Sequence, residues 1–271
     1  MSFGERLAAA VGEHGVLCAG IDPHPPLLAE WGLTDDADGL ARFADACVEA
    51  FAGHTAVVKP QSAFFERHGW RGVRVLEELL TAFSGTGTLT LLDVKRGDIG
   101  TTMDGYADAY LAVGAPLGAD AVTLSPYLGF GSLTPALDAA ADAGRGVFVL
   151  ARTSNPEGAD VQLATFGGRS VAQAMVDGAA ARNAAAPGGV GVVVGATADH
   201  DLDLSALDGP VLAPGLGAQG AGPADVAARF AGVRGTVLPA ASRSVLRAGP
   251  DQAVLRAAAE LLRDELAGAR A

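Results

Sequence analysis

The chain has 271 residues, of which 49% are hydrophobic and 18% charged, and this is the composition of a folded globular protein and not of a disordered one. The net charge of −12 argues against a non-specific nucleic-acid binder, which needs a basic surface. No apolar run approaches the roughly 18 residues that a transmembrane helix requires, and the N-terminus lacks the pattern of a signal peptide. We therefore expect a cytoplasmic protein that binds neither nucleic acid nor membranes.

Apolar, strand-like runs alternate with helix-like segments along the chain. A short amphipathic helix is expected at 3–12, and the proline-rich segment 22–26 is expected to be a loop that continues neither neighbouring element. The expected strands cover 16–21, 55–59, a run that begins at Leu89, 119–124, 146–151, 190–195, 211–213 and 235–240. The expected helices cover about 36–51, 70–83, 102–114, 132–143, 168–185 and 250–267.

Eight strands that alternate with helices, with no linker-like break, predict one (β/α)₈ TIM barrel, a single α/β domain over residues 1–271 with a short N-terminal helix. A doubly wound parallel sheet is the competing fold. The positions of the polar residues favour the barrel, because in a barrel the C-terminal ends of all strands converge on one mouth. The residues at or just past those ends are Asp22, Lys59, Asp93, Lys95, Ser154 and Arg243.

The stretch from Leu89 to Thr102 carries charges of both signs at the end of a buried strand. Alternation along the strand places Asp93 and Lys95 on the same face, and Gly97 can turn the chain so that Asp98 comes close to them. Such charges are costly to bury unless they pair, and clusters of this kind are common at functional sites. We predict a working site here, and a solvated strand-to-helix turn is the plainer alternative.

Residues 215–220 match the G-x-G-x-x-G pattern of dinucleotide-binding folds, but they follow the seventh expected strand and not the first. What remains is a loop whose backbone N–H groups, at Gly215 and Gly217, can surround a phosphate. Barrels often hold phosphate in the loops after strands seven and eight, and Arg243 follows strand eight. The pattern therefore predicts a phosphate site, against the alternative of a plain glycine-rich turn.

Metal and nucleophilic sites find little support. The five histidines lack the spacing of zinc ligands, and the segment 199–203 resembles a calcium loop but has Leu204 and Pro210 where that loop needs Gly and Glu. Neither a G-x-S-x-G elbow nor a cysteine beside a histidine is present. A Schiff base at Lys59 or Lys95 is an alternative, but the acids beside Lys95 keep its ammonium group charged, which favours a proton donor over a nucleophile.

Together these residues resemble the orotidine 5′-phosphate decarboxylase family, in its longer bacterial form (type 2). The motifs that carry the resemblance, in the family's order, are 20–23, 58–66, 93–102, 153–156, 214–220 and 242–243. The D-x-K-x-x-D-I-x-x-T core at 93–102 is the most specific of them. The resemblance implies a barrel that decarboxylates orotidine 5′-monophosphate to uridine 5′-monophosphate and carbon dioxide without a metal or cofactor.

The resemblance also implies the catalytic roles. Lys95 would protonate C6 of the pyrimidine as carbon dioxide leaves, and Asp93 would face the departing carboxylate. Lys59 and Asp98 would complete an alternating network of lysines and aspartates. In this family Asp98 and Thr102 would reach across from the partner subunit of a homodimer.

For binding, the resemblance implies that Asp22 holds the ribose hydroxyls, that Ser154 contacts the pyrimidine edge, and that Gln219 and Arg243 hold the phosphate. Two alternatives stay open. The first is a magnesium-dependent sugar-phosphate enzyme of the same superfamily, such as hexulose-phosphate synthase or ketogulonate-phosphate decarboxylase, which would be sensitive to EDTA. The second is a non-catalytic barrel that binds nucleotides.

Overall fold

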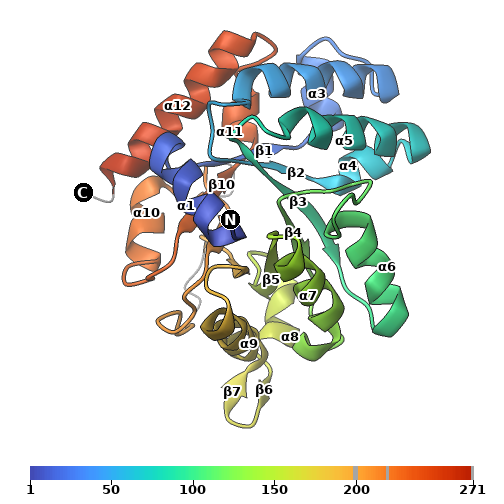
Figure 1. Ribbon diagram of the computed structural model, residues 1–271. Helices are drawn as coiled ribbons and strands as arrows, with labels where there is room; N and C mark the ends of the chain where they lie inside the picture. Colours follow the sequence, from blue (N-terminus) through green and yellow to red (C-terminus); the bar gives the residue numbers. More distant parts are fainter. Residues whose placement is uncertain (198–200, 218–219, 270–271) are drawn as a thin grey trace.

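Eight parallel strands close into a barrel in the computed structural model, which describes residues 1–197, 201–217 and 220–269 (Figure 1). Around the ring the strands follow the order β1-β10-β9-β8-β5-β4-β3-β2, and each pair is parallel. Their bounds are β1 (Cys18–Ile21), β2 (Val57–Pro60), β3 (Leu89–Arg96), β4 (Ala121–Leu124), β5 (Gly146–Arg152), β8 (Val190–Val194), β9 (Val211–Pro214) and β10 (Val237–Ala241). The predicted TIM barrel is thus confirmed.

Helices pack around the outside of the ring (Figure 1). The longer ones are α1 (Phe3–His14), α3 (Ala37–Phe51), α5 (Gly69–Phe83), α6 (Gly100–Tyr110), α7 (Thr134–Asp142), α9 (Val171–Ala185) and α12 (Gln252–Gly268). The six long helices and eight strands expected from the pattern are all present, with boundaries that shift by a few residues. No helix within the described ranges has both the length and the apolar character needed to cross a membrane.

Short elements between the strands differ from the expectation. They are α2 (Pro25–Glu30), α4 (Ser62–Glu66), α8 (Ala159–Gln162), α10 (Pro223–Arg229), α11 (Arg243–Leu246), the 3₁₀ turns Phe130–Leu133 and Pro156–Gly158, and a hairpin of β6 (Thr165–Phe166) and β7 (Arg169–Ser170). The prediction that 22–26 is a loop throughout was wrong for its last two residues, because α2 begins at Pro25. Proline fits the first turn of a helix, where its missing N–H has no intrahelical partner.

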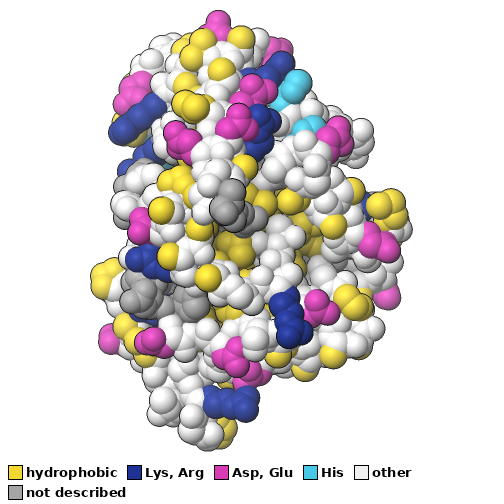
Figure 2. Space-filling model, turned by 90° about the vertical axis from the view of Figure 1, so that its left-hand side faces the viewer, with side chains coloured by type: hydrophobic (Ala, Val, Ile, Leu, Met, Phe, Trp, Pro, Cys, Tyr) yellow, Lys and Arg dark blue, Asp and Glu magenta, His cyan; other side chains and the backbone are white. Residues whose placement is uncertain are grey.

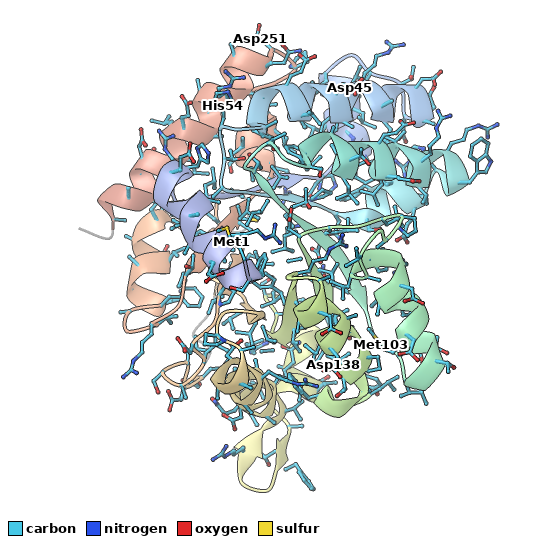
Figure 3. All side chains as sticks on the ribbon, viewed as in Figure 1. Met1, Asp45, His54, Met103, Asp138 and Asp251 are labelled. Carbon is cyan, nitrogen blue, oxygen red and sulfur yellow. The ribbon has the colours of Figure 1, made fainter. Side chains whose placement is uncertain are left out.

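The N-terminal end of the barrel is closed by α1. Phe3, Leu7 and Ala10 are buried against the inward-facing side chains of the strands, and the rings of Phe3 and Phe148 meet edge to face at 6.1 Å. In Figure 3 Met1, two residues before α1 begins, lies over the middle of the ring. This end of the barrel is therefore filled with apolar side chains.

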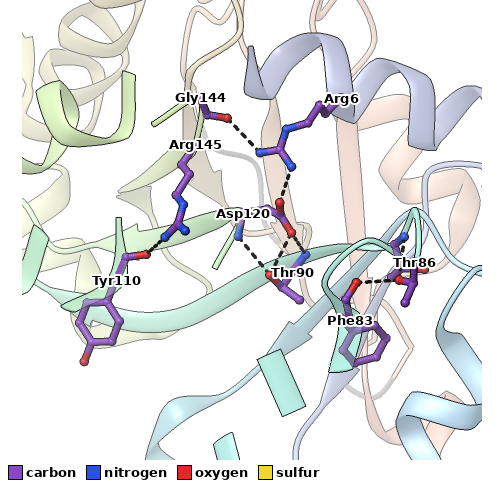
Figure 4. A network of polar contacts seen from close by, with 9 residues as sticks. Arg6, Phe83, Thr86, Thr90, Tyr110, Asp120, Gly144 and Arg145 are labelled. Carbon is purple, nitrogen blue, oxygen red and sulfur yellow. Dashed lines mark hydrogen bonds and ion pairs between the residues drawn. The ribbon is translucent and has the colours of Figure 1, made fainter. Parts of the chain in front are cut away.

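Polar contacts fix α1 in this place (Figure 4). Arg6 of α1 pairs with Asp120 and donates to the Gly144 carbonyl oxygen at 2.9 Å. Asp120 in turn accepts from the backbone N–H of Thr90 at 2.8 Å and from its hydroxyl at 3.0 Å. These contacts join α1 to the N-terminal ends of β3 and β4, so α1 covers that end of the barrel. The C-terminal end is left open for a ligand.

Candidate active site

A cavity of about 660 Å³ opens at the C-terminal mouth of the barrel. Parallel strands deliver the side chains at their C-terminal ends to this mouth, as the sequence pattern predicted. The predicted site residues in its lining are Asp22, Lys59, Asp93, Lys95, Ser154, Gly215 and Arg243. The cavity is large enough for a small organic ligand, and its lining combines apolar walls with charged groups.

Asp93 lies between two ammonium groups at the bottom of this cavity. Its Oδ2 is 3.2 Å from Nζ of Lys59, and its Oδ1 is 2.6 Å from Nζ of Lys95. Lys59 also lies 3.9 Å from Oδ1 of Asp22. Lys59 and Asp93 are buried, whereas the Lys95 side chain is 45% exposed. Of the two ammonium groups in the lining, that of Lys95 is therefore the more accessible to a ligand.

Lys59 and Lys95 are the only two lysines in the sequence, and the other basic residues are arginine or histidine. Both lysines contact the same carboxylate. A guanidinium group does not lose a proton in proteins, whereas an ammonium group can transfer one. The use of lysine at these two positions alone fits a site that needs a transferable proton.

The charges in this cluster reinforce one another. Burial acts to raise the pKa of Asp93, but Lys59 and Lys95 outweigh it and lower that pKa from 3.8 to about 2. Burial acts to lower the pKa of Lys59, but Asp22 and Asp93 outweigh it, so this pKa is raised above its ordinary value. Asp93 is therefore a carboxylate and Lys59 an ammonium group across the physiological range.

The backbone at the end of β3 is irregular. Lys95 has a φ of +46°, in the left-handed region that costs a non-glycine residue about 1–2 kcal/mol. Two residues later, a Cβ on Gly97 would collide with the carbonyl oxygen of Ser125, so the chain needs glycine there. Strain of this kind is common where a side chain must be aimed at a ligand.

Thr123, on β4, is a buried site residue that the sequence pattern did not identify. Its hydroxyl donates to Asp93 Oδ1 at 2.7 Å and accepts from the Lys95 backbone N–H at 3.0 Å. In the sequence it stands inside a Val-Thr-Leu run, where a β-branched residue is typical of any strand. No local signal distinguishes it.

Gln162 and His24 were also missed. Gln162, at the end of α8, accepts from the Thr153 backbone N–H at 2.9 Å and donates to the Thr153 hydroxyl at 2.8 Å. It thereby braces the loop that carries Ser154 into the cavity. His24 also lines the cavity. Its ring packs edge to face against the ring of Phe64, with the ring centres 4.2 Å apart.

Two of the residues predicted to bind phosphate line the cavity. Arg243 begins α11 and lines the cavity together with Gly215. Gly217 does not line it, and its backbone N–H donates to the Ala221 carbonyl at 2.8 Å. Gln219 lies outside the described residues. The loop is thus placed beside Arg243, as expected, but the amide of Gly217 is engaged within the loop.

Asp98 and Thr102 do not line the cavity of their own chain. The carboxylate of Asp98 accepts from the backbone N–H of Ile99 at 2.8 Å. The turn at Gly97 therefore does not bring Asp98 into the lining of its own cavity, because the chain leaves the barrel there to begin α6, and its closeness to Asp93 and Lys95 stays a prediction. Within the part of the chain that the structure describes, no group of three or more His, Cys, Asp or Glu side chains is arranged to hold a metal ion.

A closed parallel barrel with an acid between two lysines at its C-terminal mouth defines a TIM-barrel enzyme with a charged active site. More particularly, the chain belongs to the orotidine 5′-phosphate decarboxylase / HUMPS family, whose model matches residues 15–258.

Individual relatives agree with this family. The chain is 61% identical over 263 residues to the orotidine 5′-phosphate decarboxylase of Salinispora arenicola, covering 96% of this chain and 95% of the relative. It is 55% identical over 265 residues to that of Streptomyces coelicolor, covering 95% and 94%. A crystal structure from Streptomyces avermitilis, described as a candidate orotidine 5′-phosphate decarboxylase, has a TM-score of 0.95 at 52% identity, covering 99% of this chain and 96% of that one.

Proposed function

We propose that this protein converts orotidine 5′-monophosphate into uridine 5′-monophosphate and carbon dioxide. The relatives from Salinispora and Streptomyces have this activity by name and align with at least 95% of the chain. The structural observation that carries the assignment is the position of Asp93 between the ammonium groups of Lys59 and Lys95 inside the cavity.

The reaction breaks the bond between C6 of the pyrimidine and its carboxylate, and the electron pair stays on C6 as carbon dioxide leaves. Lys95 has an exposed ammonium group at the cavity, so it stabilises this charge and then gives C6 a proton. Water restores the proton to the lysine afterwards. The proposed chemistry uses neither a metal nor a cofactor.

Asp93 is proposed to face the substrate carboxylate. Two anions about 4 Å apart, at an effective dielectric constant near 20, repel each other by roughly 4 kcal/mol, which is about a thousandfold in rate if it is relieved in the transition state. This is one part of the acceleration. The greater part falls to Lys95, which meets a charge that develops only as the bond breaks. Lys59 holds the carboxylate of Asp93 in place, at 3.2 Å.

The remaining predicted residues are proposed to bind the substrate. Asp22 would hold the ribose hydroxyls, and Ser154 would contact the pyrimidine edge. Arg243 and Gly215 line the cavity, and we propose that they bind the phosphate together with Gly217 and Gln219. Binding energy from the distant phosphate can hold the reacting ring against Lys95 without touching the bond that breaks.

We also propose a homodimer in which Asp98 and Thr102 enter the cavity of the partner subunit. Both residues lie outside the cavity of their own chain. The neighbouring loops after β3 and β4 expose large apolar side chains, with Ile99 at 62% and Tyr127 at 79%. A contiguous exposed apolar patch rimmed by polar residues is typical of a surface that a partner covers.

Cytoplasmic location, membership of the type 2 subfamily and action as one domain over 1–271 remain predictions. The face drawn in Figure 2 has Lys and Arg side chains scattered among Asp and Glu, which fits a net charge of −12 and the proposal that nucleic acid is not a partner. The proposed location rests on the substrate, because a charged nucleotide does not cross a membrane unaided.

The activity is tested by following the loss of orotidine 5′-monophosphate absorbance with purified protein in the presence of EDTA. We expect full turnover. The family model also covers the HUMPS enzymes, so turnover of a hexulose phosphate or ketogulonate phosphate that EDTA abolishes, with no loss of orotidine 5′-monophosphate, would support the magnesium-dependent alternative. Tight binding of uridine 5′-monophosphate with no turnover of any of these would support a non-catalytic barrel.

A further inference from the structure

The β3–β4 ladder is interrupted beside the catalytic residues. Leu92 pairs with Val122 and Arg96 pairs with Leu124, so the three residues between Leu92 and Arg96 stand opposite the single residue between Val122 and Leu124, which is Thr123. A regular ladder therefore cannot hold the backbone of Lys95 at this point. The N–H of Lys95 instead donates to the Thr123 hydroxyl, at 3.0 Å.

The chemistry of the neighbours fixes the direction of both Thr123 hydrogen bonds. An N–H can only donate, so the hydroxyl oxygen accepts from Lys95. An ionised carboxylate can only accept, so the hydroxyl proton is given to Asp93 Oδ1, at 2.7 Å. Thr123 is 1% exposed, so both bonds are shielded from bulk solvent.

We propose that Thr123 is a positioning residue for the decarboxylation, because one hydroxyl fixes both the left-handed backbone of Lys95 and the carboxylate of Asp93. The inference rests on the roles proposed above for Lys95 and Asp93. Thr123 holds the stem of the proton donor at its backbone while Asp93 holds the ammonium group, at 2.6 Å. Because the backbone and the ammonium group of Lys95 are both held, its long side chain has little freedom to move away from C6.

The chain offers a matched control at the other end of the same strands. The hydroxyl of Thr90 donates to Asp120 Oδ2 at 3.0 Å and accepts from the Asp120 backbone N–H at 3.1 Å. Thr90 is 3% exposed, so it is as buried as Thr123. Its partners lie beneath the barrel, away from the cavity. The same substitution at Thr90 therefore removes the same kind of bonds without touching the catalytic residues.

The experiment compares the parent protein with Thr123→Val, Thr123→Ser and Thr90→Val, measuring kcat and KM for orotidine 5′-monophosphate, the Kd of uridine 5′-monophosphate, and Tm. We expect Thr123→Val to lower kcat about 100-fold, since misplacing a reacting group by about 1 Å has an effect of this size. KM and Kd should change less than about threefold, because Thr123 acts through Lys95 and Asp93. Thr123→Ser should recover kcat to within about threefold, and Thr90→Val should lower Tm with kcat unchanged.

A kcat for Thr123→Val within about threefold of the parent, or an equal fall of kcat in Thr90→Val, would overturn the inference. If Thr123→Val does not fold, Thr123→Cys replaces it, since a thiol is a weaker donor of similar size. A parent-like kcat in Thr123→Cys overturns the inference, and a reduced kcat supports it. An inactive parent protein would instead refute the proposed function, so the two failures are distinguishable.

Discussion

Nζ of Lys59 lies 3.2 Å from Oδ2 of Asp93, and both side chains are less than one tenth exposed. A second lysine, Lys95, reaches the other oxygen of the same carboxylate at 2.6 Å. One anion therefore compensates two cations at the bottom of the cavity. The arrangement has consequences for stability as well as for catalysis, because Asp93 is the nearer of the two carboxylates that compensate the buried ammonium group of Lys59.

Asp93→Asn removes that anion and keeps the shape of the side chain. We expect the free energy of unfolding to fall by about 3 kcal/mol, since the buried Lys59 ammonium loses the nearer of its two carboxylate partners. The matched control is Asp35→Asn, which breaks the exposed ion pair with Arg67, whose two side chains are 39% and 36% exposed. That variant should lose at most about 1 kcal/mol. Urea denaturation of the three proteins measures both values, and equal losses would contradict the compensation argued here.

The parent protein and Asp93→Asn also test how the stabilisation by Asp93 depends on pH. The folded pKa of Asp93 is lowered from 3.8 to about 2, so its contribution is fully present above pH 3.8 and is lost as the pH falls toward about 2. The stability difference between the parent protein and Asp93→Asn should therefore shrink by about 1 kcal/mol between about pH 6 and pH 3. A difference that stays constant over this range would mean that Asp93 titrates normally.

Arg243→Ala tests the phosphate end of the cavity. We expect KM to rise about 100-fold with kcat much less affected, because charge-assisted hydrogen bonds to a phosphate are worth about 2–3 kcal/mol. Arg247, one turn further along the chain, is exposed and does not line the cavity, so Arg247→Ala is the control and should leave KM unchanged. Uridine, which lacks the phosphate, should bind equally to all three proteins. A lower uridine affinity in Arg243→Ala would show that Arg243 does more than hold phosphate.

Gln162→Leu tests the brace on the loop that carries Ser154. The substitution removes both bonds to Thr153, and we expect kcat/KM to fall about tenfold as the loop loses its fixed position. Gln173→Leu is the control, because Gln173 also makes two bonds to one residue, accepting from the Asp203 backbone N–H and donating to its carbonyl oxygen, and does not line the cavity. Steady-state kinetics of both variants separate the two cases. A Gln162→Leu variant with the kcat/KM of the parent protein would show that the loop keeps its position without Gln162.

The proposed dimer predicts complementation between two inactive variants. Lys95→Ala lacks the proton donor, and Asp98→Ala lacks the group that each subunit gives to its partner. Random mixing makes about half of the dimers mixed, and each mixed dimer has one intact site, so about one quarter of the parent activity should return. The measurement is the activity of the two variants refolded together. No recovery beyond the sum of the separate variants would place Asp98 in the cavity of its own chain or outside catalysis.

The barrel itself could be predicted because its strands are apolar runs of regular spacing that end in polar residues. Val190–Val194 is fully buried, as a parallel strand covered on both faces must be. Lys59, Asp93 and Lys95 could be placed together for the same reason, since strand direction alone decides which end of the barrel they occupy.

Three features of the site escaped the pattern for physical reasons. The role of Thr123 depends on an irregular pairing between two strands, which no single segment encodes. Gln162 stands in a helix of four residues, too short to show a helical periodicity. The position of Asp98 depends on where the chain leaves the barrel after Gly97, which local pattern does not determine. Long-range geometry is the information that was missing in each case.

The most direct test of the account is the kcat of Lys95→Ala for orotidine 5′-monophosphate, measured beside the Kd of uridine 5′-monophosphate for the same variant. We predict that kcat falls by at least about 10⁴-fold, because both the proton and the cation that stabilises C6 are lost. The product should still bind within about tenfold of the parent affinity, which shows an intact cavity. A variant that binds the product normally and keeps a kcat within about tenfold of the parent would contradict the role of Lys95 as proton donor.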